Sequence, residues 1–508
     1  MKGNNKKTTS SKLIVFLSLI MTLLIVSVIT FPACSNKPAT VSVNYKYNGK
    51  TPKYVFLFIG DGMAMPQINS AETYLASMNS NTPGQPVKLS FTQFPSQGLT
   101  TTHSSNAFIT DSAAAATAIA CGYKTKSGVI AMDPSAQTKH KSIATYAKEK
   151  GMRVGIVSSV SIDHATPACF YAYKNSRKYY YSIAKQMADS GFNYYAGGGP
   201  KGDKKSKRKG RESIMSIMKK AGYKIASDKT AFNSINNSDK KVLAYDKYLD
   251  SDYALYFEMD RKNDSISLAE FTKKGIEVLK NPKGFFLMVE GGKIDWACHA
   301  NDAGSSIKDT IAFNNSIKVA LEFYRKHPNE TLIVVTGDHE CGGMTLGFAG
   351  TKYKTFFNKI KNQTQSYIEF DKVLKKYRKT HTAKNAKISD LSGAIKKAFG
   401  IDVASLNAFH KERLQKAFKV SMNLPKDKKE LKKLRKDPRY WNRYGGYDPF
   451  SVTLTHILNN LAGIGWTSFS HTAVPVPTFA IGCGHVLFNG YYDNTDIFKK
   501  MMKIMKLK

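Results

Sequence analysis

Four apolar runs in this 508-residue chain end in polar side chains, and together they limit the folds that the chain can adopt. The runs are YVFLFIGDGM, GIVSSVSIDHATP, FFLMVEGG and TLIVVTGDHE. They alternate with segments of helical pattern, such as SIATYAKEK and SIKDTIAFNNSIKVALEFYRKH. Short buried strands that alternate with helices are typical of a mostly parallel central sheet flanked by helices on both faces. We therefore predict an α/β fold of this kind.

The polar residues at the ends of these runs carry side chains that can bind metal ions. In open sheets of this class, ligands bind beyond the carboxyl ends of the strands. The residues that end the runs should therefore converge in space: Asp61, His164, Thr166, Glu290, Asp338 and His339. Nearby, Asp295 and His299 are four residues apart, so on a helix both would project from one face, where one ion could bind them. The pattern predicts an active site with several metal ions.

Ser112 is a candidate nucleophile. It lies in ITDSAAAATAIACG, where the alanine-rich run favours a helix that begins at Asp111 and Ser112. Free backbone N–H groups and the positive end of a helix would favour both an alkoxide and an anionic substrate. Taken alone, ordinary helix capping would explain the two residues. Because no histidine lies near Ser112 in the sequence, activation by a metal ion is the more economical route to a nucleophile.

The N-terminus has the layout of an export signal. Four lysines precede the run LIVFLSLIMTLLIVSVITF, and PACS follows it, so we assign residues 1–33 to a signal peptide and 34–52 to a linker. Cys34 resembles the lipid-modified cysteine of a bacterial lipoprotein, although Phe31 and Pro32 fit the usual signal poorly. An uncleaved membrane anchor and plain secretion are the alternatives. All three place the domain outside the cytoplasm, in the periplasm or at the cell surface.

The chain is strongly basic, with 76 Lys and Arg against 38 Asp and Glu, a formal net charge of +38. Many of the lysines lie in runs such as KGDKKSKRKGR and LPKDKKELKKLRK, without a groove or base-reading motif, so we expect a solvated basic surface and no specific nucleic-acid binding. Such a field would still attract anionic substrates. The strand and helix pattern breaks in a lysine-rich stretch and resumes at SFSHTAVPVPTFAIGCGHVLF, which predicts an inserted subdomain at about 349–460.

The cysteines argue against a thiolate metal site. After Cys34 their number is odd, so at least one should stay unpaired, and none forms a CxxC pair. We expect most of them to be small buried side chains. A disulfide between Cys298 and Cys341, which flank proposed ligands, is an alternative that the sequence leaves open. The five are Cys121, Cys169, Cys298, Cys341 and Cys483.

Six motifs in a fixed order give the chain a resemblance to a known family. From Lys53 to the C-terminus, IGDGM, TDSAAAATA, DHATP, VEGGKIDWACH, TGDHE and SHTAVPVP resemble the alkaline phosphatase family, so we predict one such domain over 53–508. The resemblance implies a hydrolase that releases inorganic phosphate from small phosphomonoesters through a phosphoserine intermediate at Ser112. It also implies two zinc ions and one magnesium ion.

The resemblance further implies a ligand set for each ion. One zinc ion would be bound by Asp295, His299 and His471, and the other by Asp61, Asp338 and His339. The magnesium ion would be bound by Asp61, Thr166 and Glu290. Sets with histidine suit zinc, and an all-oxygen set completed by water suits magnesium, so the partition agrees with coordination preferences.

Arg177 lies eleven residues after Thr166, where the family has its phosphate-binding arginine. A guanidinium group can hold two phosphate oxygens at once. His164 and Trp296 occupy two positions beside the ligands at which members of the family differ, so we expect them to influence magnesium affinity and phosphate release. Plain packing is the alternative for Trp296.

Two other classes of function compete with this hypothesis. A phosphodiesterase or sulfatase would use a related metal scaffold, but the arginine after DHATP and the serine in TDSAAAA favour monoesters. A non-catalytic surface lipoprotein that stores metal or phosphate would not need Ser112. Relatives of the mammalian type carry an insertion after the same TGDH-like motif and are dimers, so a homodimer is expected by analogy.

Overall fold

The computed structural model describes residues 47–78 and 85–508. The predicted signal peptide and Cys34 lie outside the described residues. Among those described, no helix is both long and apolar enough to cross a membrane.

A ten-stranded sheet forms the centre of the fold. The strand β1 (Tyr54–Gly60) is buried along its whole length and lies between two parallel neighbours. This agrees with its aromatic and branched apolar sequence, because strands covered on both faces carry such residues continuously. The strands follow the order β14 (Gly490–Asp493), β2 (Ser96–Thr101), β13 (Val476–Gly482), β8 (Thr331–Gly337), β1, β7 (Phe285–Glu290), β3 (Arg153–Ser158), β4 (Tyr194–Gly197), β6 (Val242–Tyr245) and β5 (Lys224–Ala226).

Most neighbouring strands are parallel, and β13 is the exception. It pairs antiparallel with both β8 and β2, whereas β1, β7, β3, β4, β6 and β5 are parallel to their neighbours. The predicted mostly parallel sheet is therefore confirmed.

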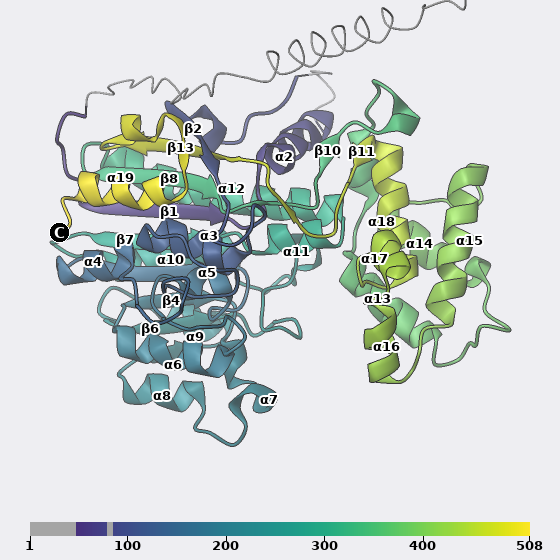
Figure 1. Cartoon of the computed structure of the whole chain (residues 1–508), viewed down its shortest axis with the longest axis horizontal. Coiled ribbons are helices and arrows are strands. Elements are labelled where there is room, and N and C mark those ends of the chain that lie inside the picture. Colours follow the sequence, from purple (N-terminus) through teal and green to yellow (C-terminus); the bar gives the residue numbers. More distant parts are fainter. Residues whose placement is uncertain (1–46, 79–84) are drawn as a thin grey trace, which may run out of the picture. The chain divides into compact units, whose positions relative to one another are not determined.

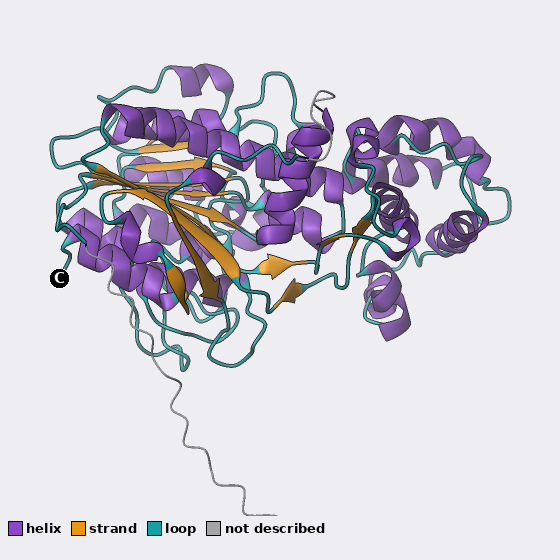
Figure 2. Ribbon diagram, turned by 90° about the horizontal axis from the view of Figure 1, so that it is seen from above, coloured by secondary structure: helices purple, strands orange, loops and turns teal. Residues whose placement is uncertain are grey.

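Helices cover both faces of the sheet (Figure 2). Side chains of β1 alternate between them: Phe56 and Phe58 pack in one apolar cluster, and Val55 and Leu57 in the other. The first cluster includes α2 (Met65–Met78), α10 (Leu268–Leu279) and α12 (Ala303–Lys326). The second includes α3 (Ser112–Cys121), α4 (Ile143–Glu149), α5 (Ala165–Ala168), α6 (Tyr180–Ser190), α8 (Ile214–Lys220) and α19 (Thr495–Met505).

The lysine-rich stretch is a group of helices between β10 (Thr345–Leu346) and β11 (Ile464–Gly465), which pair antiparallel with each other (Figure 1). Apolar side chains of this group, such as Phe370 and Leu454, belong to the same cluster as Phe56 in the sheet. The limits of the predicted insertion at 349–460 stay a prediction. The helices are α13 (Tyr367–Tyr377), α14 (Ser392–Phe399), α15 (Ala408–Met422), α16 (Lys428–Leu434), α17 (Pro438–Tyr444) and α18 (Pro449–Ala462).

Short elements complete the described part of the chain. The two that matter for the site are α11 (Lys293–His299) and a small ladder between β9 (Glu340–Cys341) and β12 (His471–Thr472). The others are α7 (Lys205–Arg208) and α9 (Lys229–Asn233), and the 3-10 turns η1 (Phe91–Gln93), η2 (Lys201–Asp203), η3 (Glu258–Asp260), η4 (Ala349–Thr351), η5 (Phe357–Asn362), η6 (Ile388–Leu391) and η7 (His485–Phe488).

Candidate active site

The carboxyl ends of the central strands bring the predicted ligands together. In the ladders of the sheet, Ile59 of β1 pairs with Glu290 of β7 and with Thr336 of β8. Asp61 and Asp338, which follow β1 and β8, therefore lie at the same edge as Glu290. Within residues 47–78 and 85–508, potential ligand atoms form three groups, each with its members within 4.8 Å of one another.

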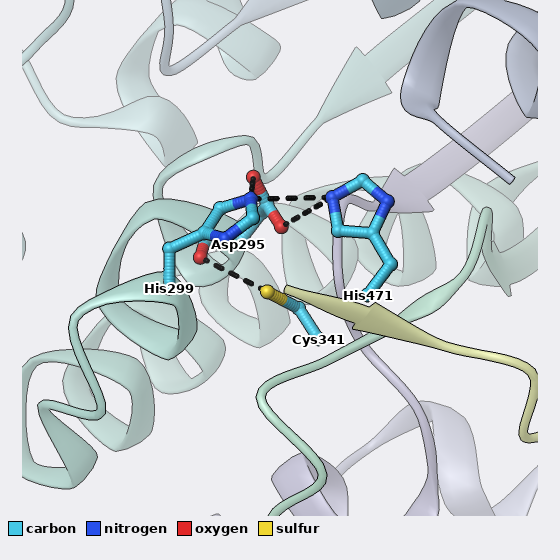
Figure 3. Close-up of side chains that lie close together, drawn as sticks. All are labelled: Asp295, His299, Cys341 and His471. Atoms are coloured by element: carbon cyan, nitrogen blue, oxygen red, sulfur yellow. Dashed lines mark hydrogen bonds and ion pairs between the residues drawn. The ribbon is translucent and has the colours of Figure 1, made fainter. Parts of the chain in front are cut away.

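The first group includes Asp295, His299 and His471, whose side chains point toward one another (Figure 3). The Nε2 atoms of His299 and His471 lie 3.2 Å apart. They are 3.4 Å and 3.5 Å, respectively, from carboxylate oxygens of Asp295. The Nδ1 atom of His299 donates a hydrogen bond to the backbone carbonyl of Phe469 at 2.7 Å, and that of His471 donates to the backbone carbonyl of Thr110 at 2.8 Å. In neutral rings, both Nε2 lone pairs therefore face the carboxylate, which suits a cation.

Two parts of the chain far apart in sequence supply Asp295, His299 and His471. Asp295 and His299 lie on α11, as predicted from their spacing. His471 arrives through the ladder in which it pairs with Cys341. Cys341 is the fourth member of the group. Its thiol donates to the carbonyl of Asp295 at 3.7 Å, and burial raises its pKa well above the usual value.

The second group consists of Asp61, Asp338 and His339, all fully buried. The Nε2 atom of His339 lies 3.3 Å from Asp61 and 3.4 Å from Asp338. It also lies 3.3 Å from the hydroxyl oxygen of Ser112. The ring of His339 stacks on that of His471 with 3.5 Å between centroids, so the first two groups are in direct contact.

The third group consists of Asp61, His164 and Glu290, and Asp61 is thus common to two groups. Ser158 donates a hydrogen bond to one oxygen of Glu290, while the other has no partner. Thr166 is fully buried at the start of α5, and its hydroxyl oxygen also lacks a partner.

Buried oxygen atoms without hydrogen-bond partners are the clearest sign that these groups fit metal ions. An unpartnered buried acceptor is costly, and a cation bound by several such atoms would remove the cost. Burial, together with repulsion from Asp338 and the other acids, raises the pKa of Asp61 well above its usual value. Burial raises the pKa of Asp338 to about 7 and that of Glu290 to about 8. The unpartnered atoms include Asp61 Oδ1 and Oδ2, Thr166 Oγ1, Glu290 Oε1, Asp295 Oδ1 and Asp338 Oδ2.

Asp295 differs from the other acids. Burial alone would raise its pKa, but His299 and His471 outweigh burial and hold the pKa well below its usual value. Positive charge on the two histidine rings favours the ionised carboxylate, which is also the form that binds a cation.

Ser112 is the first residue of α3 and is only 2% exposed. Asp111 caps the helix by accepting a hydrogen bond from the backbone N–H of Ala114 at 3.0 Å. The hydroxyl group therefore lies beside the positive end of a capped helix and beside His339 of the second group. This is the position expected of a nucleophile aimed at an anionic substrate.

Arg177 lies between Asp111 and His164. Its Nη1 atom is 3.0 Å from a carboxylate oxygen of Asp111, and its Nη2 atom donates to Nε2 of His164 at 3.1 Å. Burial acts against the charge of Arg177, but Asp111 outweighs it and raises the pKa of the guanidinium group. The sequence indicated Asp111 only as a helix cap. Its second role, as partner of Arg177, was missed because nothing local links residues so far apart in the chain.

Trp296 contacts His164 edge to face, with 5.9 Å between ring centroids. It also packs against a small apolar cluster that includes Phe257 and Tyr367. Trp296 thus lies beside His164, as predicted, and is also packed among apolar side chains, so its contacts agree with both interpretations.

The cysteines of the described residues form no disulfide. All five are free and buried, as expected for small core side chains. The alternative of a Cys298–Cys341 disulfide is therefore wrong. Cys298 instead lies 3.3 Å from the hydroxyl oxygen of Ser306.

An α/β sheet with a serine and clustered metal ligands at the carboxyl ends of its strands is typical of a metal-dependent hydrolase. The comparisons with known proteins agree. The family model of alkaline phosphatase matches residues 52–507. Alkaline phosphatase 4 of Bacillus subtilis (strain 168) is 32% identical over 461 residues, which cover 89% of this chain and 88% of that protein. The chain therefore belongs to the alkaline phosphatase family, and the predicted class of enzyme is confirmed.

Solved structures show the same fold. The alkaline phosphatase of Thermus thermophilus has a TM-score of 0.74 and 26% identity, and the alignment covers 91% of this chain and 92% of that one. The cold-active alkaline phosphatase of Shewanella sp. has a TM-score of 0.71 and 28% identity, with 89% and 99% covered. A mutant of the alkaline phosphatase from the Antarctic bacterium TAB5, with a TM-score of 0.59 and 27% identity over 90% of this chain and 99% of that one, has magnesium bound in its M3 site. The family is metal-dependent, and the fold and family support a phosphomonoester hydrolase.

Proposed function

We propose that this chain hydrolyses small phosphomonoesters in two steps through a phosphoserine at Ser112. The observation that carries the proposal is the position of the Ser112 hydroxyl, 3.3 Å from His339 and at the end of a capped helix. Its oxygen would form a bond to phosphorus as the ester bond breaks and the alcohol leaves with a proton. Water would then cleave the phosphoserine and release inorganic phosphate, with net retention at phosphorus.

The donor atoms support two zinc ions and one magnesium ion. When bound, the ions would stabilise negative charge on the phosphoryl group and on the oxygen atoms that attack and leave. Arg177, held by Asp111, would bind two of the non-bridging oxygens. The proposed sets are Asp295, His299 and His471 for one zinc ion, Asp61, Asp338 and His339 for the other, and Asp61, Thr166 and Glu290 for magnesium. His164 and Trp296 would lie beside them.

A comparison of three chromogenic substrates tests the reaction. We expect p-nitrophenyl phosphate to be hydrolysed with a far higher kcat/KM than bis(p-nitrophenyl) phosphate or p-nitrophenyl sulfate. A preference for the diester or the sulfate would assign the site to one of those classes instead. If no substrate is turned over by protein loaded with zinc and magnesium, a storage role replaces catalysis.

Replacing Asp111 with Asn should weaken the binding of phosphate. Asn still caps a helix, but it removes the negative partner of Arg177, and a partly exposed ion pair of this kind is worth about 1 kcal/mol. We expect the inhibition constant of inorganic phosphate to rise about fivefold, with stability lowered by at most about 1 kcal/mol. Asp111→Ala is the matched variant, since it also loses the cap and should lower stability by about 1 kcal/mol. An unchanged inhibition constant in Asp111→Asn would contradict this role.

We further propose that the enzyme acts outside the cytoplasm, is anchored through a lipid on Cys34 and forms a homodimer. The export layout of the N-terminus supports the first two points. Exposed apolar side chains support the third, including Phe108, at 87% exposure, and Leu99 and Tyr491 on neighbouring strands. The mass of the mature N-terminal peptide tests the anchor, and sedimentation of the purified protein tests the dimer. An unmodified peptide or a monomer at all concentrations would refute the respective point.

A further inference from the structure

A buried ion pair lies at the start of α11. Lys293, the first residue of the helix, is only 1% exposed, and its Nζ atom lies 2.9 Å from a carboxylate oxygen of Asp250. The other oxygen of Asp250 accepts hydrogen bonds from the backbone N–H groups of Asp252 and Ala254, at 2.8 Å and 3.1 Å. Lysine is rarely buried to this extent unless it is paired. The carboxylate is thus fixed in orientation, and it fixes the ammonium group.

The ammonium group of Lys293 also lies over two aromatic rings. It is 4.0 Å from the ring centroid of Phe257 and 4.5 Å from that of Trp296. The backbone N–H of Lys293 donates to the hydroxyl oxygen of Ser159 at 3.1 Å, so the base of the side chain is held as well. A desolvated cation over an indole is attracted by the negative charge of the ring face. The indole of Trp296 is therefore held at its face by a cation of fixed position.

The edge-to-face contact of Trp296 continues this arrangement to the active site. Its partner ring is that of His164, 5.9 Å away, and His164 accepts the hydrogen bond of 3.1 Å from Arg177. Contacts thus run without a gap from a carboxylate outside the catalytic groups to the guanidinium group that would bind phosphate.

We propose that Lys293, fixed by Asp250, is a positioning residue that holds Trp296 against His164 and thereby orients Arg177 for phosphate. The inference rests on the proposed function, because it assigns Arg177 to the binding of phosphate. Lys293 itself is not one of the predicted ligands, and Ser112 and Arg177 are the residues that would contact the substrate.

The test replaces both members of the ion pair. Lys293→Met alone would leave a mostly buried carboxylate without its partner, whereas the double variant Lys293→Met, Asp250→Asn removes both charges, an exchange that proteins often tolerate. In the folded double variant, we expect the inhibition constant of inorganic phosphate to rise about tenfold. We expect kcat for p-nitrophenyl phosphate to stay within about twofold of wild type. Lys293→Arg keeps a cation over the indole and should largely retain phosphate binding.

An ion pair elsewhere in the chain provides the control. Arg378 at the end of α13 contacts Asp448, which caps α18. The double variant Arg378→Met, Asp448→Asn removes the same two kinds of charge and leaves a residue that can still cap the helix. It should leave the inhibition constant of phosphate unchanged, whatever stability it loses. An equal rise in this control would mean that the effect is a general loss of stability.

A mutant cycle tests the route through Trp296. In a Trp296→Leu background, the double variant should cause no further rise in the inhibition constant, because the intermediate contact is already lost. A full additional rise in that background would overturn the proposal, as would an unchanged inhibition constant in the folded double variant.

Fluorescence supplies a readout that does not depend on turnover. The chain has three tryptophans, so replacing Trp441 and Trp466 with Phe leaves Trp296 as the single emitter. Its emission should change on titration with phosphate, and the titration midpoint should move with the inhibition constant. A wild-type protein that neither hydrolyses the monoester nor responds to phosphate would refute the proposed function together with this inference. A normal wild type with unaffected variants would refute the inference alone.

Discussion

Replacing Ser112 with alanine is expected to lower kcat for p-nitrophenyl phosphate by at least about 10³-fold and to abolish the phosphoenzyme. The hydroxyl group of Ser112 is buried beside the second group of ligands, and the alanine would offer no oxygen that could bond to phosphorus. The fold should not change, because Asp111 still caps α3 and alanine is the strongest helix former.

Rapid quenching after mixing with labelled substrate measures this prediction directly. The wild type should yield phosphate bound covalently to Ser112, and the variant none, at equal thermal stability. Ser142→Ala, which removes the hydroxyl that caps α4, is the control: it should cost about 1 kcal/mol of stability and leave the phosphoenzyme intact. Normal amounts of phosphoserine in the Ser112→Ala protein would mean that the nucleophile lies elsewhere.

Removal of the metal ions is the second change with a large expected effect. Treatment with EDTA should lower activity by at least about 10³-fold, since several kcal/mol of charge stabilisation would be lost. Zinc and magnesium added together should restore it. The protein should also unfold at a lower temperature without its ions, because buried acids would then lack partners. Activity that survives complete chelation would contradict the proposed chemistry.

Metal analysis of two variants adds a sharper distinction. Asp61 belongs to two of the three groups, whereas His471 belongs to one. Asp61→Ala should therefore lower the content of both zinc and magnesium, while His471→Ala should lower zinc alone. Equal losses in the two variants would argue against the proposed sharing of Asp61.

The sequence predicted the parts of the site that local patterns encode. Asp61, Glu290 and Asp338 could be placed because each ends a buried strand, and the carboxyl ends of parallel strands share one edge of a sheet. The spacing of Asp295 and His299 predicted their common helix face, and the structure has them on α11. Such inferences succeed because strand and helix periodicity is a local property.

Contacts between residues far apart in the sequence could not be predicted from local sequence patterns. The approach of His471 depends on a ladder of two residues on each strand, too short to leave a periodic pattern. The contact of Arg177 with Asp111 joins residues that are 66 positions apart. The antiparallel direction of β13 likewise follows from how the chain returns after α18, not from the composition of the strand. Only the family resemblance indicated His471 before the fold was known.

Because His471 lies near the C-terminal end, it is synthesised after the other residues of the candidate site. Strands β1, β3, β7 and β8 and the ligands that follow them are complete by His339, but the last side chain of the first group comes 132 residues later. A nascent chain that has not yet emerged beyond β12 lacks one of the side chains that we propose to bind metal, however well the earlier strands have assembled. Full activity therefore reports that translation and folding have passed through nearly the entire polypeptide.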